Sequence, residues 1–123
     1  MFPEDGRPGA FHLAVRDDHG AIVAVASFSA EPTPHRPGQR AIRLRGMAVD
    51  GPAQHHGVGT LLLTDAVERL ERDGVDVLWC NARDSAAGFY TRLGFEIAGG
   101  GFVLPESGIP HHVMVRDLRP GPA

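Results

Sequence analysis

The sequence predicts a single domain that mixes helices and strands (α/β in the broad sense, α+β in the narrow one), in which helices flank one sheet. Apolar, β-branched runs of strand length alternate with segments of helical periodicity, in the order ββ–β–α–β–α–ββ. The chain has 123 residues, of which 42% are hydrophobic and 22% charged, enough for one packed core but hardly for two. We therefore expect one domain over residues 1–123, without internal repeats.

The first part of the chain predicts a hairpin and then a third strand. The runs "FHLAVRD" and "AIVAVASF" are separated by "DHG", a strong turn signal, so residues 11–28 are expected to form a β-hairpin. Pro, Gly and polar residues in "SAEPTPHRPGQ" cannot extend a strand, and they indicate a surface loop. The next strand is expected at residues 41–49.

Two later segments predict helices. From Val58, apolar residues recur at helical spacing until the chain nears Gly74. The segment "DSAAGFYTRLGF" offers Asp84 or Ser85 as an N-cap and Gly94 as a C-terminal stop. We expect a long first helix and a short second one.

The remaining strands are marked by apolar runs and turns. "VDVLWC" is nearly continuously apolar, as in a central strand that is covered on both faces. A Gly-rich turn is expected at residues 99–101, followed by a strand near residues 102–104, the turn "PESGIP" and a last strand "HHVMVRDL".

Composition argues against several classes of partner. The formal net charge is −3, with acidic and basic residues mixed, so the chain has no electrostatic footprint for nucleic acid or an anionic membrane. The longest uncharged apolar stretch, "AIVAVASF", is too short to span a bilayer, and the first residues do not resemble a signal peptide. A single cysteine, Cys80, excludes an intramolecular disulfide and fits a core position. We expect a soluble, cytoplasmic protein without nucleic-acid, membrane or metal partners.

The stretch "MAVDGPAQHHGVGTLLL" predicts an anion site between a strand and a helix. Free backbone N–H groups and the positive end of the helix dipole converge at such a junction. Gly57 and Gly59 carry no Cβ, so a phosphate can approach the main chain, and Gln54 offers a side-chain donor. A P-loop would need a Gly-Lys-Ser/Thr end, and a dinucleotide fingerprint a third glycine where Leu62 stands. The alternative, glycines required only for turn geometry, stays open.

Two motifs resemble those of one enzyme family. The loop "QHHGVG" after the strand "RLRGMAV" resembles the Q/R-x-x-G-x-G/A loop of the GCN5-related N-acetyltransferases, the GNAT family. "NARDSAAGFYTRLGF" is similar to that family's segment ending in F-Y-x-x-x-G-F, at the expected distance after the first helix. The resemblance covers residues 11–118 and implies a mixed, mostly antiparallel sheet.

The resemblance also implies a shortened member of the family. We expect this chain to lack the usual first strand and the N-terminal helices that build a wall of the acceptor site. The strand at residues 11–16 is then left partly unprotected at a sheet edge, and exposed edges tend to pair, so we expect a homodimer.

The expected ligand is acetyl-CoA, lying between the strands near residues 47–49 and 78–81. The resemblance implies that strand backbone pairs with the pantetheine arm and that loop backbone holds the pyrophosphate. Arg83 stands where much of the family has Asn, and Asn81 is the expected substitute. The expected acetyl-CoA contacts are Met47, Ala48, Val49, Gln54, His55, His56, Gly57, Val58, Gly59, Thr60, Asn81, Arg83, Ala86 and Tyr90.

The implied chemistry is direct attack of a neutral amine on the thioester, in a ternary complex. In the family, a backbone N–H at the position of Ala48 stabilises the oxyanion, and a tyrosine at the position of Tyr90 is the general acid for the leaving sulfur. The alternative for Tyr90 is a core aromatic whose hydroxyl caps a backbone group. Many members place a glutamate base on the strand before the loop, but "AIRLRGMAV" has none.

His111 and His112 are the candidate bases. They lie in "GIPHHVMV", which resembles a family segment, G-I-P-H-x-x-M, that borders the acceptor cleft. Histidine titrates in the required range. Neighbours on a strand face opposite sides, so at most one of the two enters the cleft, and we expect His111. In the alternative reading both are surface or edge residues. His55 and His56 lie in the phosphate loop, where we expect them to contact solvent or phosphate.

Three functions follow from these observations. The first is an enzyme that moves acetyl from acetyl-CoA to a primary amine of a small molecule or a protein. The second is a CoA-binding sensor or regulatory domain without turnover, and the third is a shortened structural copy that acts through its sheet edge. We expect the enzyme, because Tyr90 has little reason to accompany a phosphate loop in a pure scaffold. Arg43 and Arg45 would attract an acidic acceptor if one of them faces the cleft.

Overall fold

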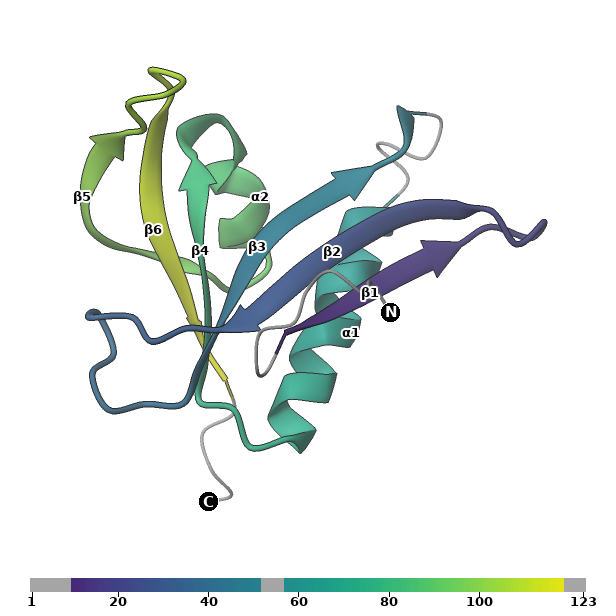
Figure 1. Ribbon diagram of the computed structural model, residues 1–123, viewed down its shortest axis with the longest axis horizontal. Helices are drawn as coiled ribbons and strands as arrows, with labels where there is room; N and C mark the ends of the chain where they lie inside the picture. The colour runs from purple at the N-terminus through teal and green to yellow at the C-terminus, as the bar shows by residue number, and fades with distance from the viewer. Residues whose placement is uncertain (1–9, 52–56, 119–123) are drawn as a thin grey trace.

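The computed structural model describes residues 10–51 and 57–118 and contains one sheet with helices on one face (Figure 1). The sheet has six strands in the order β1-β2-β3-β4-β6-β5. The elements are β1 (Phe11–Arg16), β2 (Ile22–Ala30), β3 (Ala41–Val49), α1 (Val58–Arg72), β4 (Val77–Arg83), the 3-10 turn η2 (Asp84–Ala86), α2 (Ala87–Arg92), β5 (Glu96–Val103) and β6 (Pro110–Asp117). Among the strand pairs of the described residues only β3 and β4 run parallel, so the predicted mixed, mostly antiparallel sheet is confirmed. Strand β1 lies at one edge, the feature on which the predicted homodimer depends.

The core lies between the sheet and the two helices. Alternate residues of β1, β2, β3 and β4 point to this helix-covered face, and β6 adds Met114; Phe28, Leu78 and Met114 are fully buried there. Helix α1 contributes its apolar stripe because Leu62, Leu63, Ala66 and Leu70 recur on one side. No helix in the described part of the chain is long and apolar enough to cross a membrane.

The opposite, helix-free face carries a second apolar cluster of Ala41, Val77, Trp79 and Val115. It explains why "VDVLWC" is apolar at successive positions: Val77 and Trp79 face this cluster, while Leu78 and Cys80 face the helices. The predicted central strand, covered on both faces, is therefore confirmed in β4.

A loop of residues 31–40 packs onto the helix-free face. Thr33 is buried, and the indole Nε1 of Trp79 donates a hydrogen bond of 2.9 Å to the carbonyl of Glu31. A Cβ placed on Gly99 would lie 2.8 Å from Cε1 of His35, so a glycine of β5 permits the close approach of this loop. The predicted surface loop thus covers part of the sheet that the helices leave open.

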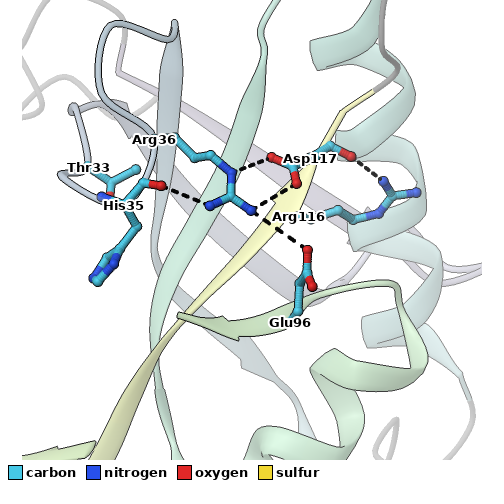
Figure 2. A network of polar contacts seen from close by, with 6 residues as sticks. All are labelled: Thr33, His35, Arg36, Glu96, Arg116 and Asp117. Carbon is cyan, nitrogen blue, oxygen red and sulfur yellow. Dashed lines mark hydrogen bonds and ion pairs between the residues drawn. The ribbon is translucent and has the colours of Figure 1, made fainter. Parts of the chain in front are cut away.

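An ion-pair cluster holds this loop against the sheet (Figure 2). Arg36 donates from Nε and Nη2 to the two carboxylate oxygens of Asp117, at 2.8 and 3.0 Å, and lies 3.7 Å from Glu96. Asp117 ends β6 and Glu96 begins β5, so one guanidinium ties the loop to both strands. The hydrogen bond from Arg36 lowers the pKa of Asp117 below its usual 3.8.

An Asp117→Asn variant should therefore lose stability in a pH-dependent way. Because the folded pKa is lowered, the stabilisation is present above pH 3.8 and is lost as the pH falls through the folded value. Because the pair is partly exposed, we expect the variant to lose about 0.5 kcal/mol of unfolding free energy at neutral pH, measured by urea unfolding. The difference in stability between the variant and the unmodified protein should become smaller in acid. Glu96→Gln should have a smaller effect, since its side chain is 68% exposed. A pH-independent loss in Asp117→Asn would contradict the ion-pair explanation.

Two local predictions are wrong. Residues 99–101 do not form a turn between strands, because β5 runs from Glu96 to Val103 with a register shift across the glycines. A Cβ on Gly101 would lie 2.9 Å from the ring of His112, so a side chain at this position would force that ring to shift.

The start of the second helix also differs from the prediction. Neither Asp84 nor Ser85 caps it; the turn η2 comes first, and α2 begins after Ala86 without a side-chain cap. Asp84 instead accepts a hydrogen bond of 2.7 Å from Nδ1 of His112. A long-range partner on β6 has replaced the local capping role.

Candidate functional site

Strands β3 and β4 pair only at their beginnings and then part, forming what we call the fork. The parallel ladder holds Ala41 with Val77, Ile42 with Leu78 and Arg43 with Trp79, and ends there. Beyond this point β3 stays paired with β2, and β4 with β6. Figure 1 shows the two strands diverging toward their carboxyl ends. Of the predicted ligand position, residues 47–49 and 80–81 lie in this fork, whereas residues 78 and 79 are still paired with β3.

A β-bulge at Arg45 sets which side chains of β3 reach the core. Leu44 pairs with Phe28 and Gly46 pairs with Ser27, which leaves Arg45 as the additional residue. After the bulge, Met47 and Val49 rather than Ala48 pack against the helix-covered core. The side chains of these two residues therefore belong to the core, while pairing of their backbone with pantetheine stays a prediction.

The predicted anion site lies at the N-terminus of α1. Gly57 is left-handed at φ 77°, and α1 has neither a side-chain cap nor an acidic residue in its first turn. The first intrahelical bond runs from the N–H of Leu61 to the carbonyl of Gly57, so the N–H groups of Val58, Gly59 and Thr60 precede it. Gln54, His55 and His56, the rest of the predicted phosphate loop, lie outside the described residues.

Gly59 is where three elements of the candidate site meet. A Cβ on Gly59 would lie 3.4 Å from Cζ of Phe89 on α2 and 3.7 Å from Cε of Met47 on β3. A Cβ at these distances would make ordinary van der Waals contacts, so α1, α2 and β3 lie close together here, and phosphate access at Gly59 stays a prediction. A Cβ built on Gly57 would meet no atom of the described residues within 4 Å, and phosphate access there also stays a prediction.

Tyr90 is half-buried on α2, between two aromatic rings. The rings of Phe89 and Phe95 meet it edge to face, with centroids 5.2 and 5.3 Å away. Burial, with a smaller effect of the Cys80 thiol, raises the pKa of Tyr90 to about 12. Its hydroxyl makes no hydrogen bond within residues 10–51 and 57–118, in contrast to the alternative of a backbone-capping tyrosine. The phenol therefore keeps its proton at neutral pH.

His111 and His112 face opposite sides of β6, as strand geometry predicts. His111 is 5% exposed, stacks on Phe102 at 5.7 Å, and places Nδ1 2.8 Å from the carbonyl of Ile109. A carbonyl only accepts, so Nδ1 is the donor, and in the neutral form of the ring Nε2 is the nitrogen with the lone pair. The reading of both residues as surface positions is wrong for His111, while His112 bonds Asp84.

The remaining predicted contacts line the end of β4 and the start of α2. Asn81 is half-buried, Arg83 is exposed at the last position of β4 opposite His111, and Ala86 is half-buried between η2 and α2. Cys80 is buried, which raises the pKa of its thiol to about 12 and confirms the core position. The described residues contain no group of three or more His, Cys, Asp or Glu side chains placed to hold a metal.

A charged cluster that no motif in the sequence indicates lies at the fork. The guanidinium carbon of Arg43 lies 5.3 Å from the centre of the Trp79 ring, and Nη1 donates to Glu31 at 3.2 Å. The other carboxylate oxygen of Glu31 accepts from the hydroxyl of Ser29 at 2.6 Å. These residues come from three segments, and the strand register that joins them has no signal in the sequence.

Comparison with known proteins gives the class to which this fold and site belong. The Acetyltransferase (GNAT) family matches residues 2–95. The uncharacterized N-acetyltransferase YitI of Bacillus subtilis (strain 168) is 38% identical over 118 residues, which cover 96% of this chain and 78% of YitI. This chain therefore belongs to the GNAT acetyltransferase family.

Solved structures show the same fold. One from Corynebacterium glutamicum ATCC 13032, described as histone acetyltransferase HPA2 and related acetyltransferase, has a TM-score of 0.77 at 22% identity, over 98% of this chain and 71% of that chain. An aminoglycoside 6'-N-acetyltransferase complexed with coenzyme A has a TM-score of 0.75 at 14% identity, over 94% of this chain and 77% of that chain. At these identities the likeness concerns the fold alone.

Proposed function

We propose that this protein transfers the acetyl group of acetyl-CoA to a primary amine, of a small molecule or a protein, by direct attack in a ternary complex. The observation that carries the proposal is the contact at Gly59, which brings β3 after its bulge, the N-terminus of α1 and the helix of Tyr90 to one place. Acetyl-CoA would need these three elements close together, because β3 would hold the thioester, the N-terminus of α1 the pyrophosphate, and Tyr90 the leaving sulfur.

The donor set of this region fits acetyl-CoA. The N–H groups of residues 57–60 are suited to the pyrophosphate, because they precede the first helical bond and no acidic residue follows in the first turn. The proposed pantetheine contacts on β3 are the backbone of Met47, Ala48 and Val49, which lie beyond the end of the ladder with β4. Asn81, Arg83, Ala86 and Tyr90 supply the proposed contacts from the other side of the fork.

In the proposed reaction a neutral amine attacks the thioester carbon, and the carbonyl oxygen becomes an oxyanion. A backbone N–H near Ala48 stabilises that charge, and collapse of the intermediate breaks the C–S bond. Tyr90 is the proposed hydrogen-bond donor to the departing sulfur. With a pKa of about 12 it stays protonated and stabilises the developing thiolate by donating a hydrogen bond. His111 is the proposed base, because its Nδ1 is occupied by Ile109 and leaves Nε2 to accept the amine proton.

Calorimetric titration of the tag-free chain with acetyl-CoA tests the first half of this proposal. We expect saturable binding that weakens with a dephosphorylated analogue and more strongly with a pantetheine-only analogue, because the α1 N-terminus loses its anion. Equal affinity for all three ligands would contradict the phosphate site. A folded chain that binds none of them would contradict the enzyme and the sensor alike and leave the structural copy.

A non-catalytic CoA sensor is the second candidate, favoured by one observation. Strand β3 carries Arg43 and Arg45 and no carboxylate, so the base that many family members place there is missing. Release of CoA in the presence of a panel of primary amines separates the two candidates. Turnover supports the enzyme, whereas tight binding without CoA release supports the sensor.

We also propose that the protein acts in the cytoplasm as a homodimer paired through β1. The support is the position of β1 at the sheet edge, where its outer backbone groups have no strand partner in the described part of the chain. Size-exclusion chromatography with light scattering should give twice the chain mass. A clean monomer at high concentration would contradict the dimer.

A further inference from the structure

We infer that Arg43 recognises a carboxylate on the amine acceptor, so that the preferred acceptors are amino acids or other amines with a carboxylate close to the reacting nitrogen. The inference rests on the proposed function and narrows its substrate class. It concerns the charged cluster at the fork, which no step of the proposed acetyl transfer uses.

The position of Arg43 places it where an acceptor would approach. Arg43 and Trp79 form the last pair of the β3–β4 ladder, so they lie where the fork begins to open. Trp79 belongs to the helix-free face, and its stacking with Arg43 places the guanidinium on that face too. The helices and the phosphate-binding N-terminus of α1 belong to the other side of the sheet. An acceptor that enters from the helix-free face therefore meets Arg43 at the base of the fork.

The guanidinium is held in place before any ligand arrives. Its carbon lies 5.3 Å over the centre of the Trp79 ring, a cation–π contact that restrains the plane of the group. Glu31 accepts from Nη1 at 3.2 Å and is itself held by Ser29 at 2.6 Å. The backbone of Glu31 is anchored separately, since its carbonyl accepts from Trp79 Nε1 at 2.9 Å. Little side-chain entropy remains to be lost when an anion binds.

Not all hydrogen-bond donors of this guanidinium have a partner within the described residues. Nε of Arg43 is buried and has no hydrogen-bond partner within the residues that the structure describes, although the side chain as a whole is 31% exposed. A buried donor without a partner costs free energy, and an arginine has several N–H groups beyond the one that Glu31 takes. A carboxylate is the planar anion that pairs with such donors two at a time.

Matched ligand pairs test the inference directly, because Trp79 is the only tryptophan of the chain. The CoA-saturated protein is titrated with L-lysine against cadaverine and with L-leucine against isoamylamine, and the emission of Trp79 is followed. Each carboxylated ligand should bind at least about 10-fold more tightly than its decarboxylated partner. The same preference is expected in kcat/KM for CoA release.

Three variants make the test specific. Arg43→Gln should abolish the preference, and Arg43→Lys should keep part of it, since the charge remains and the planar fork is lost. Arg72→Gln, at the exposed end of α1, is the matched control and should keep it in full. Circular dichroism of Arg43→Gln checks that the variant folds, and Arg43→Lys carries the test if it does not.

Two outcomes would overturn the inference. Either the paired ligands give equal responses in the unmodified protein, or Arg43→Gln keeps the full preference. Turnover of both amines of a pair at equal rates would refute carboxylate recognition and leave the acetyltransferase standing. Failure of the proposed function is a different result, seen as absence of acetyl-CoA binding in the calorimetric titration.

Discussion

Tyr90→Phe should lower kcat about 100-fold while the affinity for acetyl-CoA stays unchanged. The substitution removes one hydroxyl from a ring that is packed between Phe89 and Phe95, so neither the core nor the fork should move. What is lost is a donor whose pKa of about 12 keeps it protonated throughout the working range. Steady-state CoA release gives kcat, and calorimetry gives the affinity.

The control for this variant is Thr91→Ala, on an exposed position of the same helix, which should keep full activity. The pH profile adds a second check. Because the folded pKa of Tyr90 is raised, ionisation of the phenol should produce no fall in kcat below about pH 10. Unchanged kcat in Tyr90→Phe would show that the residue is a core aromatic and that another group serves the leaving sulfur.

Much of the fold could be predicted because its elements are marked locally. The hairpin depends on a turn between two β-branched runs, and α1 on helical spacing that ends beside Gly74, whose φ is 78°. The errors occur where tertiary contacts override local signals. The sequence predicts Asp84 as an N-cap, but its carboxylate accepts a hydrogen bond from His112 of β6. The glycines before Phe102 are predicted to form a turn, but His112 packs against one of them within a strand.

The candidate site was predictable in its glycines and its tyrosine but not in its charges. Gly57 needs a left-handed backbone, which restricts the residue type and so leaves a signal in the sequence. The bulge at Arg45 leaves none, yet it decides that Met47 and Val49 face the core. The pairing of Arg43 with Glu31 depends on how a loop returns to a strand. No family motif indicates the Arg43–Glu31 pair, and only the packing of the loop against the strand in the folded structure brings these two residues together.

Phe28→Ala should be the most destabilising single change, lowering the free energy of unfolding by about 3–5 kcal/mol. Phe28 is 0% exposed and stacks on Phe11 of the edge strand, with centroids 4.7 Å apart and planes 9° from parallel. Removing the ring opens a cavity in the core and takes away the partner that holds β1 against β2. Domains of this size have total stabilities of about 5–15 kcal/mol, so the variant should unfold at much lower urea concentration.

The same substitution tests how the bulge is held. Phe28 pairs with Leu44, the residue immediately before Arg45, so a cavity at Phe28 removes packing directly beside the bulge. Phe28→Leu should cost less, about 1–2 kcal/mol, because most of the buried volume remains. If Phe28→Ala, measured where it is still folded, also weakens acetyl-CoA binding while Phe28→Leu does not, the bulge depends on this ring. If Phe28→Ala costs no more than Phe28→Leu, the core beside the bulge collapses around the missing ring. In that case the pairing of β2 with β3, rather than the packing of Phe28, keeps the fork in shape.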